Sequence, residues 1–147
     1  MAWNRVAGSA PTEAKRIPVM QGRFLNVQRS SYGSARFTFD ELCRKDVGAA
    51  DYMAVCEHYH TVFLEGIPVM TWEQRNELRR FILLIDELYN NSIRLVCLAD
   101  ASPENLLQKG TGAPYDELFA FDRCASRLIE MQSKEYLSKV SIHQHDQ

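Results

Sequence analysis

The sequence predicts an α/β fold built on a βαβ unit. Two apolar strand patterns, at about 61–65 and 93–98, flank a long pattern in which apolar residues recur every three or four positions, as in an amphipathic helix. The connection from Leu64 to Ile93 is long enough for a right-handed crossover, so the two strands are expected to run parallel. Several helices and a hairpin-like N-terminal segment are expected to flank this unit. A chain of 147 residues, 46% of them hydrophobic, suits one domain.

The N-terminal part is predicted to hold a loop, a hairpin and two short helices. Residues 1–16 are small and polar and are expected to form a loop or a truncated end. The stretch IPVMQGRFLNVQRS is broken by Gly22, which indicates a strand with a turn, or one arm of a hairpin. A turn, a short strand and a helix start follow in SSYGSARFTFDELC, where Asp40 and Glu41 favour the positive end of the helix. A second short helix is expected after Gly48.

The central part carries the clearest strand signal. In HTVFLEGIPVM, β-branched and apolar residues are closed by Gly66 and Pro68. Thr71 is expected to cap the long helix, with the Gln74 side chain reaching back in a capping box. SIRLVCLAD is an uninterrupted apolar run, which is typical of a strand covered on both faces.

The C-terminal part is predicted to be helical. Ser102 and Pro103 indicate a helix start, and KGTGAP is expected to be a loop. The last helix is predicted at about 116–137, and residues 138–147 are expected to form a disordered polar tail. Residues 17–137 should therefore make up one α/β region.

Composition excludes several classes of function. The net charge is −2, so the chain has no overall basic field for nucleic acid or an anionic membrane. No run approaches 18 apolar residues, so no transmembrane segment is expected. The first residues also lack the apolar core of a secretory signal.

The cysteines and histidines do not form a recognisable site. The cysteines lie at positions 43, 56, 97 and 124, too far apart for a CxxC pair, and buried free thiols are the simplest interpretation. His58 and His60 would face one way in an extended chain, but no third metal ligand follows at a useful spacing, so no metal is predicted. A thiol enzyme using Cys56 with His58 or His60 is a remote alternative.

Phosphate-binding motifs are absent from these 147 residues. The sequence has no G-x-x-x-x-G-K-[ST], and Lys109-Gly110 has the wrong order. VFLEG resembles the end of an acidic metal-binding strand, but it offers Glu65 alone where two acids are wanted. A surface acid beside a turn glycine is therefore the preferred interpretation of Glu65.

Arginines on two predicted helices are the candidate binding residues. Arg79 is expected on the solvated face of the long helix, whereas Arg80 lies close to its apolar face. Arg123 and Arg127 form a similar pair one turn apart on the last helix. Spacing alone leaves two roles open: structural ion pairing, or a reach toward an anion, for which the fixed fork of a guanidinium is suited.

Five stretches of the sequence resemble the ZapE-like AAA+ ATPases, which in eukaryotes include the lactation-elevated mitochondrial ATPases, also called ATPase family gene one. The stretches are ARFTFDELC, GAADYMAV, YHTVFLEGIPVM, RRFILLIDELYNNSIRLVCLAD and FAFDRCASRLIEMQSKEYL. They follow the family's order and cover about residues 17–137. The resemblance implies an AAA+ ATPase, with ATP and Mg²⁺ as cofactors of the full-length family.

The resemblance covers only about the carboxyl-terminal third of the family, whose P-loop, acidic strand and first sensor lie upstream. We therefore expect a fragment, a truncated gene product or a duplicated remnant, with no cofactor of its own and no ATP turnover alone. The family's RRF block matches Arg79-Arg80-Phe81, and its SRL block includes Arg127. In AAA+ machines such arginines often sense the γ-phosphate, so Arg79, Arg80 and Arg127 are the candidates for nucleotide sensing.

Two functions remain open at this point. The first is an ATPase-derived segment, since the family is tied to ATP hydrolysis, mitochondrial protein quality control and bacterial division under stress. The alternative is a non-catalytic interaction module that docks on a full-length relative or a client protein, including a membrane protein. A homo-oligomer is a further possible assembly. The location implied is mitochondrial in a eukaryote and cytoplasmic in a bacterium.

The strand–helix–strand order also copies the layout of an ATPase core's acidic strand, helix and sensor strand. The region is thus expected to be a degenerate second α/β half, with Leu64 and Leu98 on adjacent parallel strands. Relatives often have a serine before the alanine of LVCLAD, and Leu98 occupies that place here.

Overall fold

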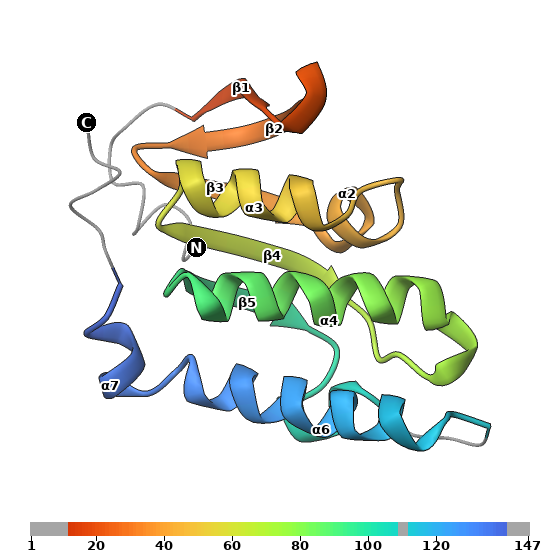
Figure 1. Ribbon diagram of the computed structural model, residues 1–147. Coiled ribbons are helices and arrows are strands. Elements are labelled where there is room, and N and C mark those ends of the chain that lie inside the picture. Colours follow the sequence, from red (N-terminus) through yellow and green to blue (C-terminus); the bar gives the residue numbers. More distant parts are fainter. Residues whose placement is uncertain (1–11, 109–111, 141–147) are drawn as a thin grey trace.

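A five-stranded mixed sheet forms the centre of the protein. A computed structural model describes residues 12–108 and 112–140, and in this part the sheet order is β1-β2-β3-β4-β5 (Figure 1). The first three strands pair antiparallel, and β3, β4 and β5 run parallel. The strands are β1 (Glu13–Pro18), β2 (Phe24–Ser31), β3 (Ser34–Thr38), β4 (Thr61–Ile67) and β5 (Arg94–Ala99). The predicted α/β fold with parallel strands and an N-terminal hairpin is confirmed.

Helices pack on one face of this sheet (Figure 1). The two longest, α4 and α6, lie side by side, and none of the helices in the described residues is long and apolar enough to cross a bilayer. The α-helices are α2 (Phe39–Cys43), α3 (Ala49–His58), α4 (Arg75–Asn90), α5 (Pro103–Leu106), α6 (Tyr115–Glu130) and α7 (Lys134–Leu137). Two 3-10 turns, η1 (Met20–Gly22) and η2 (Trp72–Gln74), complete the set.

The βαβ unit is β4–α4–β5, as the sequence predicts. Leu64 pairs in register with Cys97, so Leu64 and Leu98 lie on adjacent parallel strands, which confirms the predicted adjacency. The capping box forms between Thr71 and Gln74 as expected, with Thr71 N–H donating to Gln74 Oε1 at 2.8 Å. It caps the 3-10 turn η2 rather than α4 itself, which begins one turn later.

The boundary predicted at the N-terminus is wrong for residues 13–16. These residues belong to β1, although Glu13, Ala14, Lys15 and Arg16 are all exposed. Strand pairing uses backbone N–H and C=O groups, so a polar segment can join an edge without an apolar pattern. Residues 1–11 lie outside the described part of the chain.

The predicted coverage of β5 on both faces is also wrong. This strand lies at the end of the sheet order, and the Leu98 side chain is 62% exposed. An apolar run shows that a strand is suited to burial. Whether it is buried depends on which other elements pack over its faces.

The last predicted helix is broken in two. Helix α6 ends at Glu130, and α7 begins after a turn whose Ser133 Oγ accepts a hydrogen bond from Tyr136 N–H. A serine that caps a new helix competes with continuation of the old one. Residues 141–147 of the predicted tail lie outside the described residues, and Val140 packs partly against the core.

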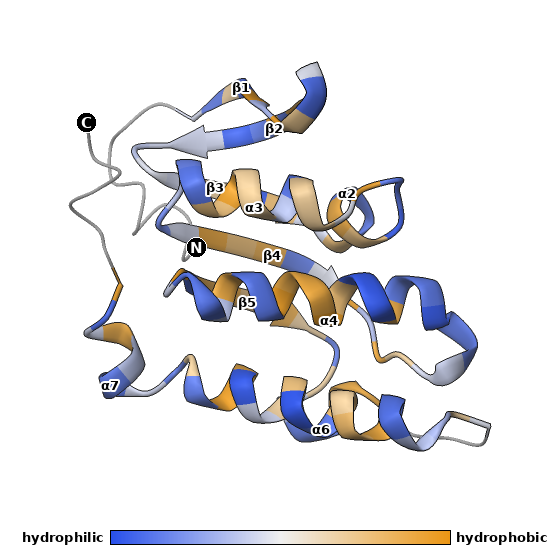
Figure 2. Cartoon of the chain, viewed as in Figure 1, coloured by the Kyte–Doolittle hydropathy of each residue, from blue (hydrophilic) through white to orange (hydrophobic). Residues whose placement is uncertain are grey.

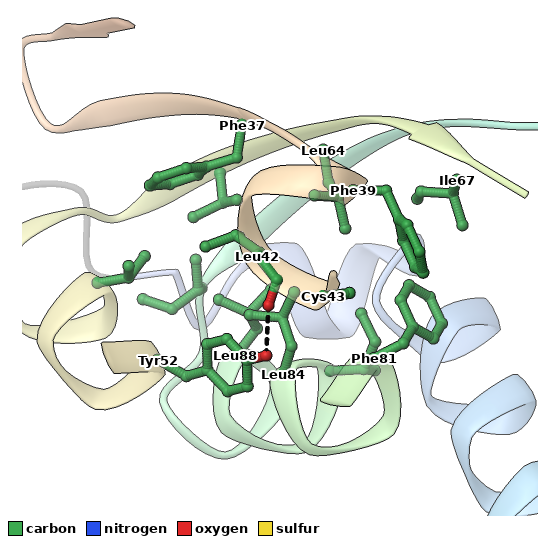
Figure 3. Packing of buried hydrophobic residues seen from close by; sticks show 14 of the residues in the cluster. Phe37, Phe39, Leu42, Cys43, Tyr52, Leu64, Ile67, Phe81, Leu84 and Leu88 are labelled. Atoms are coloured by element: carbon green, nitrogen blue, oxygen red, sulfur yellow. Dashed lines mark hydrogen bonds between the residues drawn. The ribbon is translucent and has the colours of Figure 1, made fainter. Parts of the chain in front are cut away.

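The core lies between the sheet and the helices. Phe37 and Leu64 point from the sheet toward Leu42 of α2 and Leu84 of α4 (Figure 3). Tyr52 is fully buried there, and its hydroxyl donates to the Leu42 carbonyl at 2.6 Å. Figure 2 shows apolar and polar residues alternating along α4 and α6, as expected for helices with one buried face.

Candidate functional site

Helix α4 carries two of the three candidate arginines on opposite flanks. Its apolar stripe, which includes Leu78 and Phe81, packs into the core, so the residues beside that stripe point sideways. Arg79 points toward α6, and Arg80 points toward the end of α2. Both arginines lie near the end of α4 that follows the carboxyl end of β4 (Figure 1).

Arg79 is engaged at the surface between α4 and α6. Its Nη2 lies 3.2 Å from Glu117 Oε1, and its guanidinium lies 5.1 Å from the centre of the Trp72 ring. The Arg79 side chain is 53% exposed. An exposed ion pair of this kind is worth about 0–1 kcal/mol, so Arg79 can leave Glu117 at little cost.

Arg127 is engaged more firmly. It forms an ion pair with Asp86 of α4, and its guanidinium lies 4.8 Å from the centre of the Tyr89 ring. Arg123 Nη2 lies 3.7 Å from the other Asp86 oxygen. One carboxylate thus faces two guanidiniums, which holds α6 against α4 and leaves about one positive charge in excess.

Arg80 has the least satisfied guanidinium of the three. It is half-buried, and its Nη1 donates only a long hydrogen bond of 3.5 Å to the Cys43 carbonyl. Among the described residues, no carboxylate forms an ion pair with it. A guanidinium has five N–H donors, so most of the donor capacity of Arg80 remains available.

The three arginines do not converge on one point. Arg80 and Arg79 diverge across α4, and the partner of Arg127, Asp86, lies two turns further along that helix. At 1.5 Å per residue this separates Asp86 from Arg79 by about 10 Å along the axis. A single small anion cannot be held by all three in this arrangement.

Glu65, at the carboxyl end of β4, is held by arginines of the two preceding strands. Arg36 Nη2 lies 2.8 Å from Glu65 Oε2, and Arg29 Nη2 lies 3.1 Å from Oε1. The hydrogen bond from Arg36 is the main cause that lowers the pKa of the Glu65 carboxyl. Burial, the second-largest cause, opposes it, and the charges of Arg36 and Arg29 lower this pKa further. This carboxylate is neutralised by its neighbours, and sequence reasoning did not find those partners.

Among the described residues, Cys56 and His58, one pair considered for a thiol enzyme, each bond to a backbone carbonyl and not to one another. Burial raises the pKa of Cys43, Cys56 and Cys124 to about 12 each. Cys56 Sγ donates to the Glu87 carbonyl at 3.6 Å, while His58 Nδ1 lies 2.9 Å from the Ala54 carbonyl. Within residues 12–108 and 112–140, no group of three or more His, Cys, Asp or Glu side chains is placed to hold a metal.

An apolar groove of about 500 Å³ lies beside β5, and sequence reasoning missed it. One wall is β5 itself, and the other is formed by α5, the end of α6, and α7. Two errors hid it: β5 was expected to be covered, and α6 and α7 were expected to be one helix. The turn at 131–133, whose Met131 and Gln132 line the groove, bends the chain around it.

Comparison with known proteins places the chain in a family. A sequence model of the AFG1-like ATPase family matches residues 1–140, so the chain belongs to that family. No solved structure matches the fold of this chain.

Relatives occur in a bacterium, a fish and a yeast. The chain is 42% identical over 103 residues to the cell division protein ZapE of Escherichia coli (strain K12), which covers 69% of this chain and 26% of ZapE. It is 32% identical over 148 residues to lactation elevated protein 1 homolog B of Danio rerio, covering 82% of this chain and 29% of that protein. An uncharacterized protein of Schizosaccharomyces pombe is 29% identical over 139 residues. The chain thus spans about a quarter to a third of the length of the relatives it matches.

Proposed function

We propose that this chain is the nucleotide-sensing and interaction part of an AFG1-like ATPase, and that Arg80 is its sensing residue. The observation that carries the proposal is the half-buried Arg80 guanidinium, whose partner in the described residues is one carbonyl at 3.5 Å. Because the chain belongs to an ATPase family, the phosphates of ATP are the anion that the Arg80 guanidinium is proposed to bind. Arg79 and Arg127, which are already paired with carboxylates, serve as docking residues between α4 and α6.

The residues of this chain do not fit a complete ATP–Mg²⁺ site. The sequence has no glycine-lysine cradle for the phosphates, and the Glu65 carboxylate is occupied by Arg36 and Arg29. A P-loop must therefore come from outside these residues before hydrolysis can occur. We further propose a role in protein quality control, in mitochondria for a eukaryotic source and in the cytoplasm for a bacterial one.

The test measures ATP turnover and the effect of one arginine. The purified chain is expected to show no turnover above buffer. In a full-length AFG1-like ATPase that has an arginine at the position of Arg80, replacing that arginine by alanine is expected to lower kcat at least about tenfold, since charge stabilisation by such an arginine supplies several kcal/mol. Replacing the residue that matches exposed Arg75 is the control and should leave kcat unchanged. Turnover by the isolated chain that survives Arg80→Ala contradicts the proposal.

A second candidate function is a non-catalytic interaction module that docks on a full-length relative or a client protein. The exposed apolar edge strand β5 and its groove favour it. Large exposed apolar patches on soluble domains mark sites of association.

A further inference from the structure

The outer edge of β5 offers unpaired backbone groups. Arg94 N–H donates to the His60 carbonyl at 2.8 Å, and Asp100 N–H donates to the Ile67 carbonyl at 2.9 Å, both on the β4 side. Backbone groups alternate along a strand, so the N–H and C=O groups of Leu95 and Cys97 point the other way. Within the described residues no strand pairs with that side.

The groove beside this edge is apolar and open. Leu95 and Cys97 pair in register with the core residues Val62 and Leu64, so their side chains lie on the helix-covered face. Leu128 of α6 and Leu137 of α7 form the opposite wall, and the Leu137 side chain is 42% exposed. The groove therefore combines a strand edge that can form backbone hydrogen bonds with an apolar wall that can contact alternate side chains of a partner strand.

A charge of each sign marks the two ends of the strand. Arg94 begins β5 and Asp100 follows it, about 20 Å apart at 3.3 Å per residue. Neither side chain forms an ion pair with another described residue. An antiparallel partner strand is complementary in charge to β5 if it carries a basic residue opposite Asp100 and an acidic residue opposite Arg94.

We propose that an extended apolar segment of a partner protein adds to β5 as a sixth, antiparallel strand. Its alternate side chains enter the groove under Leu128 and Leu137, and its charged ends meet Arg94 and Asp100. Backbone pairing supplies affinity in this mode of recognition, and the pockets and charges supply selectivity. Antiparallel pairing is chosen because it is slightly more stable per residue than parallel pairing. The inference rests on the interaction-module candidate above and not on ATP hydrolysis.

The helix layer argues against a second copy of this chain as the occupant. Helix α6 packs beside α4 and lies beyond β5 in the layer of helices (Figure 1). A second copy pairing through its own β5 would bring its α4 into the space that α6 already fills. A lone extended segment brings no helix on that face and fits.

The test uses a seven-residue peptide, Lys-Val-Thr-Val-Thr-Val-Asp-amide, with a fluorophore coupled to its N-terminal amine so that the lysine side chain keeps its charge. Antiparallel to residues 94–100, its three valines share the groove face with Leu95 and Cys97. The peptide with lysine and aspartate exchanged is the matched control. Fluorescence anisotropy is expected to show binding at least about fivefold tighter for the first peptide, because opposed cross-strand charges attract and like charges repel.

Two protein variants locate the binding site. Leu137→Glu places a charge in the groove wall and should weaken peptide binding at least about tenfold. Ile129→Glu alters an equally exposed residue of α6, 47% against 42%, that does not line the groove, and should leave binding unchanged. Far-UV circular dichroism confirms that both variants fold. Bound peptide should also slow alkylation of Cys97, the one exposed cysteine of the four.

The proposal is overturned by any of three results. These are no binding at about 1 mM peptide, equal or reversed preference between the two peptides, and binding that survives Leu137→Glu. Dimerisation of the chain through β5 under reducing conditions, seen by sedimentation and abolished by Leu137→Glu, would overturn it as well by making a second copy the occupant. The peptide assay contains no nucleotide, so loss of the Arg80 proposal leaves its outcome unchanged.

Discussion

The Glu65 side chain links three strands through ion pairs and hydrogen bonds. Its carboxylate accepts from Arg36 of β3 and Arg29 of β2, while its own backbone belongs to β4. The Glu65 side chain is 22% exposed, so solvent screens these pairs less than it screens ion pairs on the outer helix surfaces. The position that the sequence indicated as a surface acid is therefore a cross-strand clamp.

Glu65→Gln should destabilise the protein in a pH-dependent way. The folded pKa of Glu65 lies below its ordinary value of 4.5, so the clamp contributes fully above about pH 4.5. It is lost as the pH falls through the lowered folded pKa. We expect the melting temperature of Glu65→Gln to lie below that of the wild type at pH 7, and the difference to vanish on acidification.

Thermal melts of both proteins across that range provide the measurement. Glu57→Gln changes an exposed acid of α3 and is the control, with a small difference at every pH. A Glu65→Gln difference that stays constant down to about pH 2 would show that the lowered pKa has no part in it.

At the scale of elements, short helices depend on their first turn. Helix α2 has five residues, too few for stability from propensity alone. Thr38 N–H donates to Glu41 Oε1 at 2.8 Å, and Glu41 N–H donates to Thr38 Oγ1 at 3.1 Å. This capping box also sets the direction in which the chain leaves β3.

Thr38→Ala should lower the free energy of unfolding by about 1 kcal/mol, the usual cost of losing an N-cap oxygen. Thr38→Ser keeps that oxygen and should stay within about 0.5 kcal/mol of the wild type. Urea denaturation of the three proteins decides the matter. Equal midpoints for the alanine and serine variants would mean that the cap contributes nothing.

Sequence patterns could predict the elements whose conformation follows from local signals, such as caps and apolar periodicity. The β4–α4–β5 unit has β-branched strands, a capping box and a regular apolar stripe, and each is local. The exposed face of β5 could not be predicted, because it depends on which helices or loops pack over that face of the sheet. The break after Glu130 is visible in sequence only as Ser133, and a single serine can also lie on the exposed face of an unbroken helix.

The candidate site was predictable to a similar extent. The arginines were found by spacing and resemblance, but their partners are 37 to 41 residues away in the chain. Contacts at that separation, such as Arg127 with Asp86, are set by how helices pack. The groove depends on how four elements, β5, α5, α6 and α7, pack together, and no one of them carries a sequence signal for it.

At the scale of the whole molecule, one tyrosine connects the last helix to the core. Tyr136 of α7 is buried, and its hydroxyl lies 2.7 Å from the Ile93 carbonyl and 3.2 Å from the Leu88 carbonyl. Its ring stacks on Tyr89 with centroids 5.8 Å apart. The end of α4, the start of β5 and α7 are thereby joined.

Tyr136→Phe should reduce the free energy of unfolding by about 1–2 kcal/mol, because the Ile93 carbonyl loses the buried hydroxyl that donates to it at 2.7 Å while packing is kept. Amides of α7 should exchange with deuterium faster than in the wild type. Tyr115→Phe, at a side chain that is 73% exposed, is the control and should change neither quantity. Wild-type exchange in α7 of the Tyr136→Phe variant would refute the anchoring role.

The order of strands in the sheet is the order of strands in the chain, β1 through β5. During synthesis from the N-terminus, each strand from β2 to β5 emerges after the strand with which it pairs. Assembly can therefore proceed by accretion, without waiting for a distant segment to close a long loop. Among the described residues, the last strand to join the sheet is β5, and the backbone groups on its outer edge remain unpaired.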